Sequence, residues 1–141
     1  MNSIVLNVSV DQKIRFELYE NSAPITCNTF CSKLPFEIKL LHAKLAGEEI
    51  WSPNGPELDI IQENSTIHVE PGEIVIAPIN PIRNQIRKCI GIFYGNGKLV
   101  DCANVFAKVF PDDINKLKQL GEDIWLNGSK IIRFEMLQKE T

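Results

Sequence analysis

The sequence predicts a mostly-β fold: a closed, roughly eight-stranded β-barrel with two helices capping its ends. Short runs that alternate apolar and polar residues recur along the chain, as expected for half-buried strands. Helical periodicity is confined to two segments, one early and one late in the chain. This many strands in 141 residues would leave exposed edges unless the sheet closes, so we expect one domain that spans residues 1–141.

A hairpin and a helix are expected first. Residues 4–10 and 14–19 alternate around a short polar turn, which is typical of a β-hairpin. Asn21 or Ser22 is expected to cap the helix that follows, and Pro35 to end it. The apolar face of this helix consists of Ala23, Cys27, Phe30, Cys31 and Leu34.

The middle of the chain is expected to consist of short strands joined by turns. Residues 36–41, 48–51 and 73–77 are predicted strands. The Pro-Gly pair at 71–72 predicts a turn before the last of them. Residues 78–84, with two prolines and two asparagines, are predicted to form a loop.

Two more strands and the second helix are expected in the last third of the chain. Residues 89–94 and 103–110 are predicted strands, and the Gly-Asn-Gly run at 95–97 is predicted to stop the first of them in a turn. Asp112 is expected to cap the second helix and Gly121 to end it.

A closing hairpin is predicted at the end of the chain. Residues 124–126 and 130–137 are its expected strands. Asn127 and Gly128 between them suit a two-residue hairpin turn. With this hairpin the predicted strands are numerous enough to close a barrel.

Composition and charge exclude several classes of partner. The net charge is −3, the pI is about 5.4 and the basic residues are scattered, so we expect no nucleic-acid binding. No apolar run approaches the roughly 20 residues of a membrane-spanning helix, so no membrane association is expected. The first residues alternate without a basic start or a small-residue cleavage site, which predicts a cytoplasmic protein. We expect a monomer or a homodimer.

The four cysteines form no Cys-x-x-Cys pair. Cys27 and Cys31 lie one helical turn apart and could form half of a metal site, completed by His42 or His68. The alternative is that they are two small core residues in a reducing compartment. We favour this alternative because structural zinc sites usually have tighter paired spacing, and we expect no metal and no cofactor.

Several segments resemble the cyclophilin family residue by residue. The two strands within residues 8–19 are similar to the opening cyclophilin hairpin. Residues 23–30 (Ala-Pro-Ile-Thr-Cys-Asn-Thr-Phe) resemble the first cyclophilin helix, which typically reads Pro-x-Thr-x-x-Asn-Phe, with one extra residue here. Residues 105–109 (Val-Phe-Ala-Lys-Val) resemble the cyclophilin segment Val-Phe-Gly-Lys-Val. The resemblance covers nearly the whole chain and implies a cyclophilin-like barrel.

Within that fold, a closer resemblance is to small prokaryotic cyclophilin-like proteins of unknown function. Those proteins carry a Gly-Glu-Glu-Ile-aromatic segment, then Pro-Gly-(Asp/Glu) before a strand, then an apolar strand that ends in Phe-aromatic-Gly. The corresponding segments here are residues 47–51, 71–73 and 92–95. The order and spacing of the three motifs carry this resemblance.

The cyclophilin resemblance argues against normal prolyl isomerase activity in this chain. Cyclophilins hold a proline in an apolar pocket and stabilise the twisted amide with an arginine. Here the corresponding segment, residues 48–51, holds two carboxylates, and no arginine occurs between Arg15 and Arg83. The position of the cyclophilin pocket histidine corresponds to Ala103 or Asn104. We therefore expect isomerase activity to be absent or vestigial.

The candidate ligand-binding residues are Glu48, Glu49, Trp51, Arg83 and Phe93. The first three lie where the cyclophilin site would be, and could form a pocket wall whose carboxylate binds a polar or cationic ligand or acts as a general base. An edge strand with outward charges and one inward aromatic ring explains them equally well. Arg83 could bind an anion or be an ordinary solvated charge, and Phe93 could line the pocket or fill the core.

Three functions are compatible with these residues. The first is binding of a small polar ligand or peptide in a pocket at the site equivalent to the cyclophilin active site, by a protein that could also be a small enzyme. The second is a non-catalytic protein-interaction module. The third is a divergent peptidyl-prolyl cis-trans isomerase. The expected partner is thus a small molecule or a proline-containing peptide, and no catalytic residue can be assigned.

Overall fold

The structure is a computed structural model that describes residues 2–44, 46–78 and 88–137. Eight strands, two α-helices and one short 3₁₀ turn make up these residues, so the predicted mostly-β class is confirmed. In chain order they are β1 (Ser3–Ser9), β2 (Gln12–Leu18), α1 (Pro24–Ser32), β3 (Phe36–His42), β4 (Gly47–Ser52), β5 (Ser65–Val69), β6 (Glu73–Ile76), β7 (Ile90–Val109), η1 (Pro111–Asp113), α2 (Ile114–Asn127) and β8 (Lys130–Met136).

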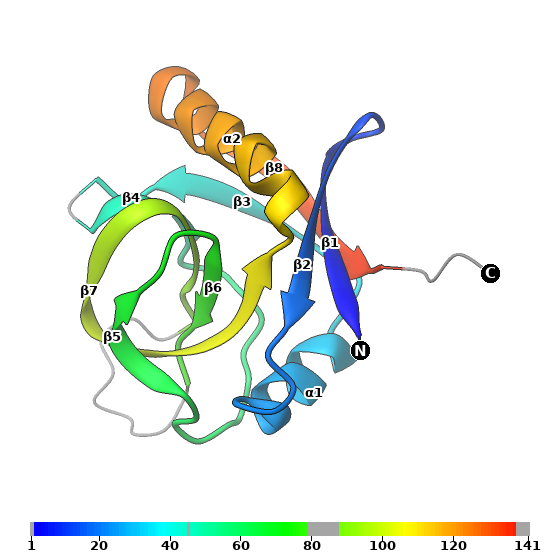
Figure 1. The fold of residues 1–141 in the computed structure, drawn as a ribbon, viewed down its shortest axis with the longest axis vertical. Coiled ribbons are helices and arrows are strands. Elements are labelled where there is room, and N and C mark those ends of the chain that lie inside the picture. The colour runs from blue at the N-terminus through cyan, green and yellow to red at the C-terminus, as the bar shows by residue number, and fades with distance from the viewer. Residues whose placement is uncertain (1, 45, 79–87, 138–141) are drawn as a thin grey trace.

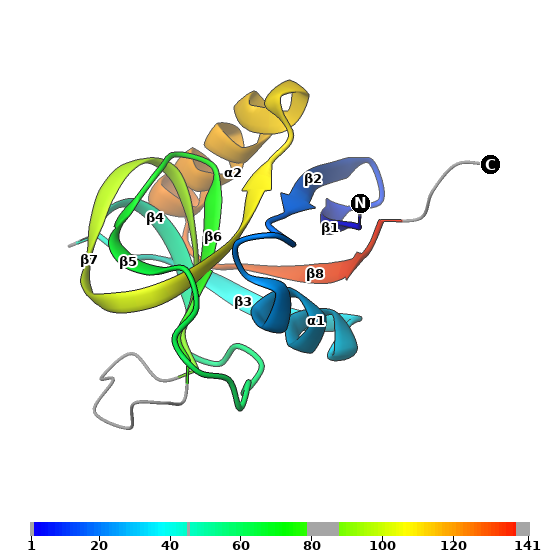
Figure 2. The ribbon, with the colours of Figure 1, turned by 60° about the horizontal axis from the view of Figure 1, so that its bottom comes forward.

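The strands form one antiparallel sheet in which hydrogen-bonded neighbours complete a ring. Its order is β2, β1, β8, β3, β4 and β7, and β7 pairs back onto β2. The short strand β6 lies between two arms of β7: Ile74 pairs with both Ile92 and Ala107. β5 pairs with the middle of β7, outside this ring. Figures 1 and 2 show β7 curling around β5 and β6, with α1 and α2 on opposite sides of the sheet.

The long strand β7 corrects one prediction. The Gly-Asn-Gly run at 95–97 does not form a turn, because the strand continues through it from Ile90 to Val109. Its glycines provide space instead: a Cβ at Gly95 would collide with the carboxylate of Glu48, and one at Gly97 with the ring of Phe93. A glycine inside a strand often marks such a close approach.

Helix α2 corrects the predicted end of the chain. It continues past Gly121, where a Cβ would overlap the ring of Tyr94, so this glycine serves close packing between α2 and β7. The helix ends at Asn127, and Gly128 follows with a φ of 96° and donates its N–H to the Ile124 carbonyl. Asn-Gly is therefore a helix C-terminus, where glycine readily adopts positive φ, and the predicted hairpin is wrong. Instead, β8 pairs with β1 and β3.

Helix α1 begins without a side-chain cap of its own. Its N-cap is Ala23, so the prediction of Asn21 or Ser22 as the cap is wrong. The carboxylate of Glu63 accepts hydrogen bonds from the N–H groups of Ile25 (3.2 Å) and Thr26 (2.8 Å). A distant acid thus satisfies the orphan donors of the first turn. The predicted apolar face is confirmed, since Ala23, Cys27 and Phe30 are buried while Cys31 and Leu34 pack against the same core.

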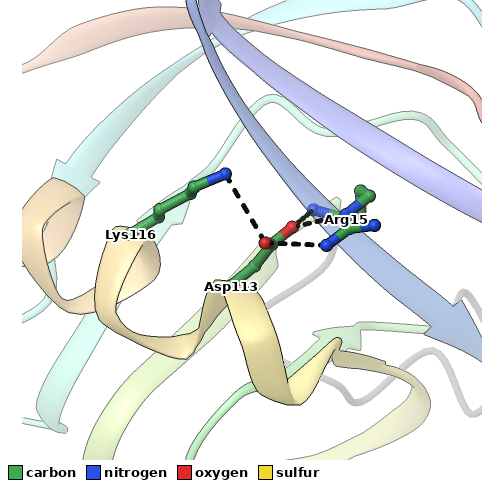
Figure 3. A network of polar contacts seen from close by, with 3 residues as sticks. All are labelled: Arg15, Asp113 and Lys116. Carbon is green, nitrogen blue, oxygen red and sulfur yellow. Dashed lines mark hydrogen bonds and ion pairs between the residues drawn. The ribbon is translucent and has the colours of Figure 1, made fainter.

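Asp113 joins the start of α2 to strand β2 (Figure 3). It is 1% exposed and precedes the helix, whereas Asp112 was the predicted cap. Its carboxylate accepts hydrogen bonds from the backbone N–H, Nε and Nη2 of Arg15 at 2.9, 2.9 and 3.1 Å. Lys116 Nζ lies 3.6 Å away. The hydrogen bonds from Arg15 hold the pKa of Asp113 below its ordinary value.

The described residues form two apolar clusters. The larger one lies within the ring and includes residues of both helices, such as Phe30 of α1 and Leu117 of α2. The smaller one lies where β5, β6 and β7 meet, and consists of Val69, Val75, Phe93, Leu99, Ala103 and Val105. The smaller cluster adjoins the hollow described next, to which it contributes Val75, Leu99 and Ala103.

Candidate functional site

A hollow of about 370 Å³ opens between β4, β6 and β7, and we call it the β4–β7 hollow. Ligand pockets in proteins commonly begin at about this volume. Its lining is predominantly apolar, which is typical of small-molecule sites. The described residues that line it are His42, Ala43, Lys44, Ala46, Glu49, Trp51, Val75, Cys89, Gly91, Leu99, Val100 and Ala103.

Glu49 is the acidic residue among those lining residues. It is 6% exposed, on β4, where it pairs with Phe93 of β7. Its carboxylate lies over Gly91, since a Cβ at that glycine would fall on Oε2. No hydrogen bond or ion pair joins this carboxylate to another described residue, although the Cys89 thiol in the same hollow is near enough to interact with it electrostatically. Burial raises the pKa of Glu49 to about 7, because desolvation penalises the charged form.

Gly91 has two roles in placing the carboxylate. It pairs with Trp51 across the β4–β7 ladder, and its missing side chain leaves the space that the Glu49 side chain occupies. Trp51 lines the hollow next to it, half-buried. The result is an acid and an aromatic ring at one wall of an apolar space, an arrangement suited to a ligand with an apolar body and one polar group.

A group of aromatic rings lies at the β3–β4 end of the hollow. His42 Nε2 and the Tyr94 hydroxyl lie 2.6 Å apart, and the His42 ring packs edge-on against Trp125 of α2. The Nδ1 atom of His42 is buried without a hydrogen-bond partner among the described residues. Burial and the nearby Lys44 lower the pKa of His42, which favours a neutral ring. The Lys44 ammonium lies over the Trp125 ring, 5.1 Å from its centroid.

A second hollow, of about 280 Å³, lies on another face of the same strands. It is lined by polar side chains, among them Glu48, Asn96, Lys118 and Glu122. Glu48 accepts a hydrogen bond from the Asn96 N–H at 3.3 Å. Successive residues of a strand point to opposite faces, so Glu48 and Glu49 belong to different hollows.

The structure brings together two of the five candidate residues, Glu49 and Trp51, in the β4–β7 hollow. Glu48 lines the second hollow. Phe93 is 0% exposed and belongs to the smaller apolar cluster, and Arg83 lies outside the described residues. The alternative of an edge strand with outward charges is wrong, because β4 pairs with both β3 and β7 and Glu49 is buried. Only Glu48 is exposed as that alternative expects.

Sequence reasoning missed several wall residues. Cys89, Leu99 and Val100 reach the hollow only because β7 curls back on itself, and no short motif signals that curl. His42 was considered only as a metal ligand. It lies at the end of β3, and its position beside the hollow follows from the pairing of Leu41 with Trp51.

The metal alternative receives no support from the described residues. They contain no group of three or more His, Cys, Asp or Glu side chains that could hold an ion. Cys27 is buried, its Sγ lies 3.4 Å from the Phe106 carbonyl oxygen, and desolvation raises its pKa to about 12. His68 is exposed on β5. Within the described ranges, no helix is long and apolar enough to cross a membrane.

Comparison with solved structures finds similar folds. McbB, whose structure was solved in complex with tryptophan, superposes with a TM-score of 0.73 at 15% sequence identity, over 98% of this chain. This chain spans 46% of McbB, so the likeness concerns about half of that protein. The solution structure of the hypothetical protein AF2241 from Archaeoglobus fulgidus matches over 95% of this chain and 93% of its own, with a TM-score of 0.63 and 19% identity. At these identities the likeness shows the fold alone.

Sequence comparisons give a family. A search of curated proteins finds no match. The model of one protein family, described as "Protein of unknown function (DUF3830)", matches residues 5–136, which include every strand and helix of the structure in whole or in large part. The chain therefore belongs to the DUF3830 family.

Proposed function

We propose that the β4–β7 hollow binds a small ligand that has an apolar body and a polar group directed at Glu49. The observation that carries this proposal is the Glu49 carboxylate, buried in an apolar hollow of about 370 Å³ without a partner among the described residues. A buried polar group is costly unless it is hydrogen-bonded. A protein that keeps such a group at the wall of an open hollow has a site ready for a ligand that supplies the missing bond.

We further propose that the ring of strands is a cyclophilin-like closed barrel without normal prolyl isomerase activity. The ring of paired strands, with a helix on either side, supports the closed barrel. The proposed absence of normal isomerase activity rests on the charges at the hollow. The charged side chains among its described lining residues are Glu49 and Lys44, and no arginine is among them. A carboxylate would repel the amide oxygen that the cyclophilin arginine stabilises.

McbB suggests which compound to try first. Its structure contains tryptophan, a small molecule with an aromatic body and a charged amine. The likeness to McbB extends to the fold alone, so it does not locate a tryptophan site here. Tryptophan has a ring for the apolar walls and an ammonium donor for Glu49, and in this binding mode its carboxylate faces Lys44 or the open mouth of the β4–β7 hollow rather than Glu49.

Cys89 offers a direct test of ligand binding, because it lines the hollow and is half-buried. We expect tryptophan, or a better ligand from a screen of small aromatic compounds, to slow alkylation of Cys89, measured by mass spectrometry of the digested protein. Cys31 on α1 is also half-buried and lies outside the hollow, so its rate serves as the internal control. Because burial raises the pKa of Cys89 to about 11, the reaction is best run in mildly alkaline buffer.

Two results would contradict the proposal. One is a ligand that stabilises the protein against heat while leaving the alkylation rate of Cys89 unchanged, since it would bind elsewhere. The other is catalysis of isomerisation in an Ala-Pro reporter peptide well above background. That activity would place the chain among the prolyl isomerases.

A further inference from the structure

Three buried carboxylates can be compared in this molecule: Glu49, Glu73 and Asp113, which are 6%, 8% and 1% exposed. Asp113 accepts three hydrogen bonds from Arg15. Glu73 accepts hydrogen bonds from the Tyr19 hydroxyl and the Glu70 N–H, both at 2.7 Å. Glu49 has no such donor among the described residues. Among the described residues, two of these buried acids are therefore satisfied within the fold, and the third, Glu49, lines the hollow.

The chemistry of the hollow restricts what can satisfy Glu49. Gly91 lies against the carboxylate, Val75 is next to Gly91, and most of the other lining residues are apolar. A ligand amide or carboxylic acid would bring an acceptor that needs a donor of its own. An amine bears only donors once it is protonated, and its charge is opposite to that of the carboxylate. Charge-assisted hydrogen bonds of this kind are about twice as strong as neutral ones.

We propose that the β4–β7 hollow selects a protonated amine attached to an apolar body, that Glu49 receives the ammonium group, and that Glu49 gives up its proton to solvent when the amine binds. This inference rests on the proposed function, because it names the ligand class of the same site. In the free protein at low to neutral pH the carboxyl group keeps its proton. The bound cation then favours the carboxylate, so binding of the amine and loss of the proton are linked.

The hollow contains other titratable groups besides Glu49. Among the described lining residues they are His42 and Lys44 from the β3–β4 side and Cys89 next to β7, whereas β6 contributes apolar Val75. The pKa of His42 is lowered and that of Cys89 is raised to about 11, so neither shift moves that group toward the range of Glu49. Because the ordinary pKa of His42, 6.5, lies near that of Glu49, about 7, the proton released on binding is assigned to Glu49 by its loss in a Glu49→Gln variant.

The test is calorimetric titration with three compounds of one shape: phenethylamine, phenethyl alcohol and hydrocinnamate. At about pH 8 we expect phenethylamine to bind at least about tenfold more tightly than phenethyl alcohol. Hydrocinnamate, whose negative charge is repelled by Glu49, should bind most weakly. The affinity of the amine should fall about tenfold between pH 8 and pH 6. Titrations in two buffers of different ionisation enthalpy should show about one proton released per amine at pH 6 and almost none at pH 8.

The variant Glu49→Gln tests whether Glu49 recognises the ammonium group or whether the hollow binds any compound of this shape. The substitution should lower the affinity for phenethylamine about tenfold and change the affinity for phenethyl alcohol by no more than about twofold. It should also abolish proton release. Glu48→Gln, on the same strand but in the second hollow, is the matched control and should change none of these values. The alcohol reports whether each variant still has an intact hollow, so a misfolded variant would be recognised by loss of both ligands.

The outcomes distinguish this inference from the proposed function. Equal affinities of amine and alcohol, without proton release, would overturn the choice of an amine and leave the hollow as a binding site. Tight amine binding that survives in Glu49→Gln would also overturn it. Failure of all three compounds and of tryptophan to bind wild-type protein at millimolar concentration would overturn the inference and the proposed function together.

Discussion

The substitution Glu49→Gln should change how the stability of this protein depends on pH. In the folded protein the pKa of Glu49 is raised to about 7 from an ordinary value of 4.5. That difference corresponds to about 3 kcal/mol of the free energy of unfolding. Glutamine keeps the shape of the side chain and removes its titration. We therefore expect the variant to gain stability relative to wild type as the pH rises.

The direction of this change in stability follows from which state, folded or unfolded, binds the proton of Glu49 more tightly. Between the unfolded and the folded pKa, the folded protein binds more protons than the unfolded chain does, so stability falls as the pH rises through this window. The favourable contribution of the protonated acid is complete below about pH 4.5 and is lost by about pH 7. His42 acts in the opposite sense, because its pKa is lowered, but its contribution is common to both proteins and cancels when they are compared.

Urea denaturation of both proteins at about pH 5 and pH 8 measures the effect. The stability of Glu49→Gln minus that of wild type should increase by about 2–3 kcal/mol between these two values. Glu48→Gln serves as the control and should show no comparable change, because Glu48 is exposed. A difference between Glu49→Gln and wild type that stays constant with pH would refute the assignment of Glu49 as a buried acid with a raised pKa.

Three further substitutions test contacts that hold the helices in the fold. Asp113→Ala should cost about 3 kcal/mol in chemical denaturation, because it removes a buried acceptor and leaves the β2 N–H of Arg15 without its bond. Gly121→Ala should destabilise by about 1–3 kcal/mol through overlap with Tyr94, although the same change in an exposed helix usually stabilises, so a gain in melting temperature would contradict the packing described. Glu63→Ala should cost about 1–2 kcal/mol and speed amide exchange in the first turn of α1, and unchanged exchange there would contradict its capping role.

The fold class could be predicted because the local patterns of most strands agree with the final structure. Alternation at period two correctly predicted β1 and β2, and the strand predicted at residues 36–41 is β3. The Pro-Gly turn at 71–72 precedes β6 as expected, with a φ of 92° at Gly72. Two of the errors have one cause. Glycine was interpreted as a stop signal in β7 and in α2, whereas Gly95, Gly97 and Gly121 each make room for a side chain from elsewhere in the fold. A tertiary contact of this kind leaves no local signature.

The same reasoning explains how much of the site could be predicted. Glu49 and Trp51 were found because two acids and an aromatic residue lie together in one short strand. Sequence alone could not choose between Glu48 and Glu49, since the choice depends on which face of β4 meets the curl of β7. Gly91 was not singled out, although its missing side chain is what allows the Glu49 carboxylate to lie inside the hollow.

The most direct test of the central claim is an NMR titration that locates the bound ligand. Isotope-labelled protein would be titrated with phenethylamine and with tryptophan while backbone amide shifts are followed. We expect the largest changes at Glu49, Gly91 and Ala103, around the β4–β7 hollow. Changes concentrated at Asn96 and Glu122, around the second hollow, or no changes at saturating ligand, would contradict the claim that the β4–β7 hollow is the functional site.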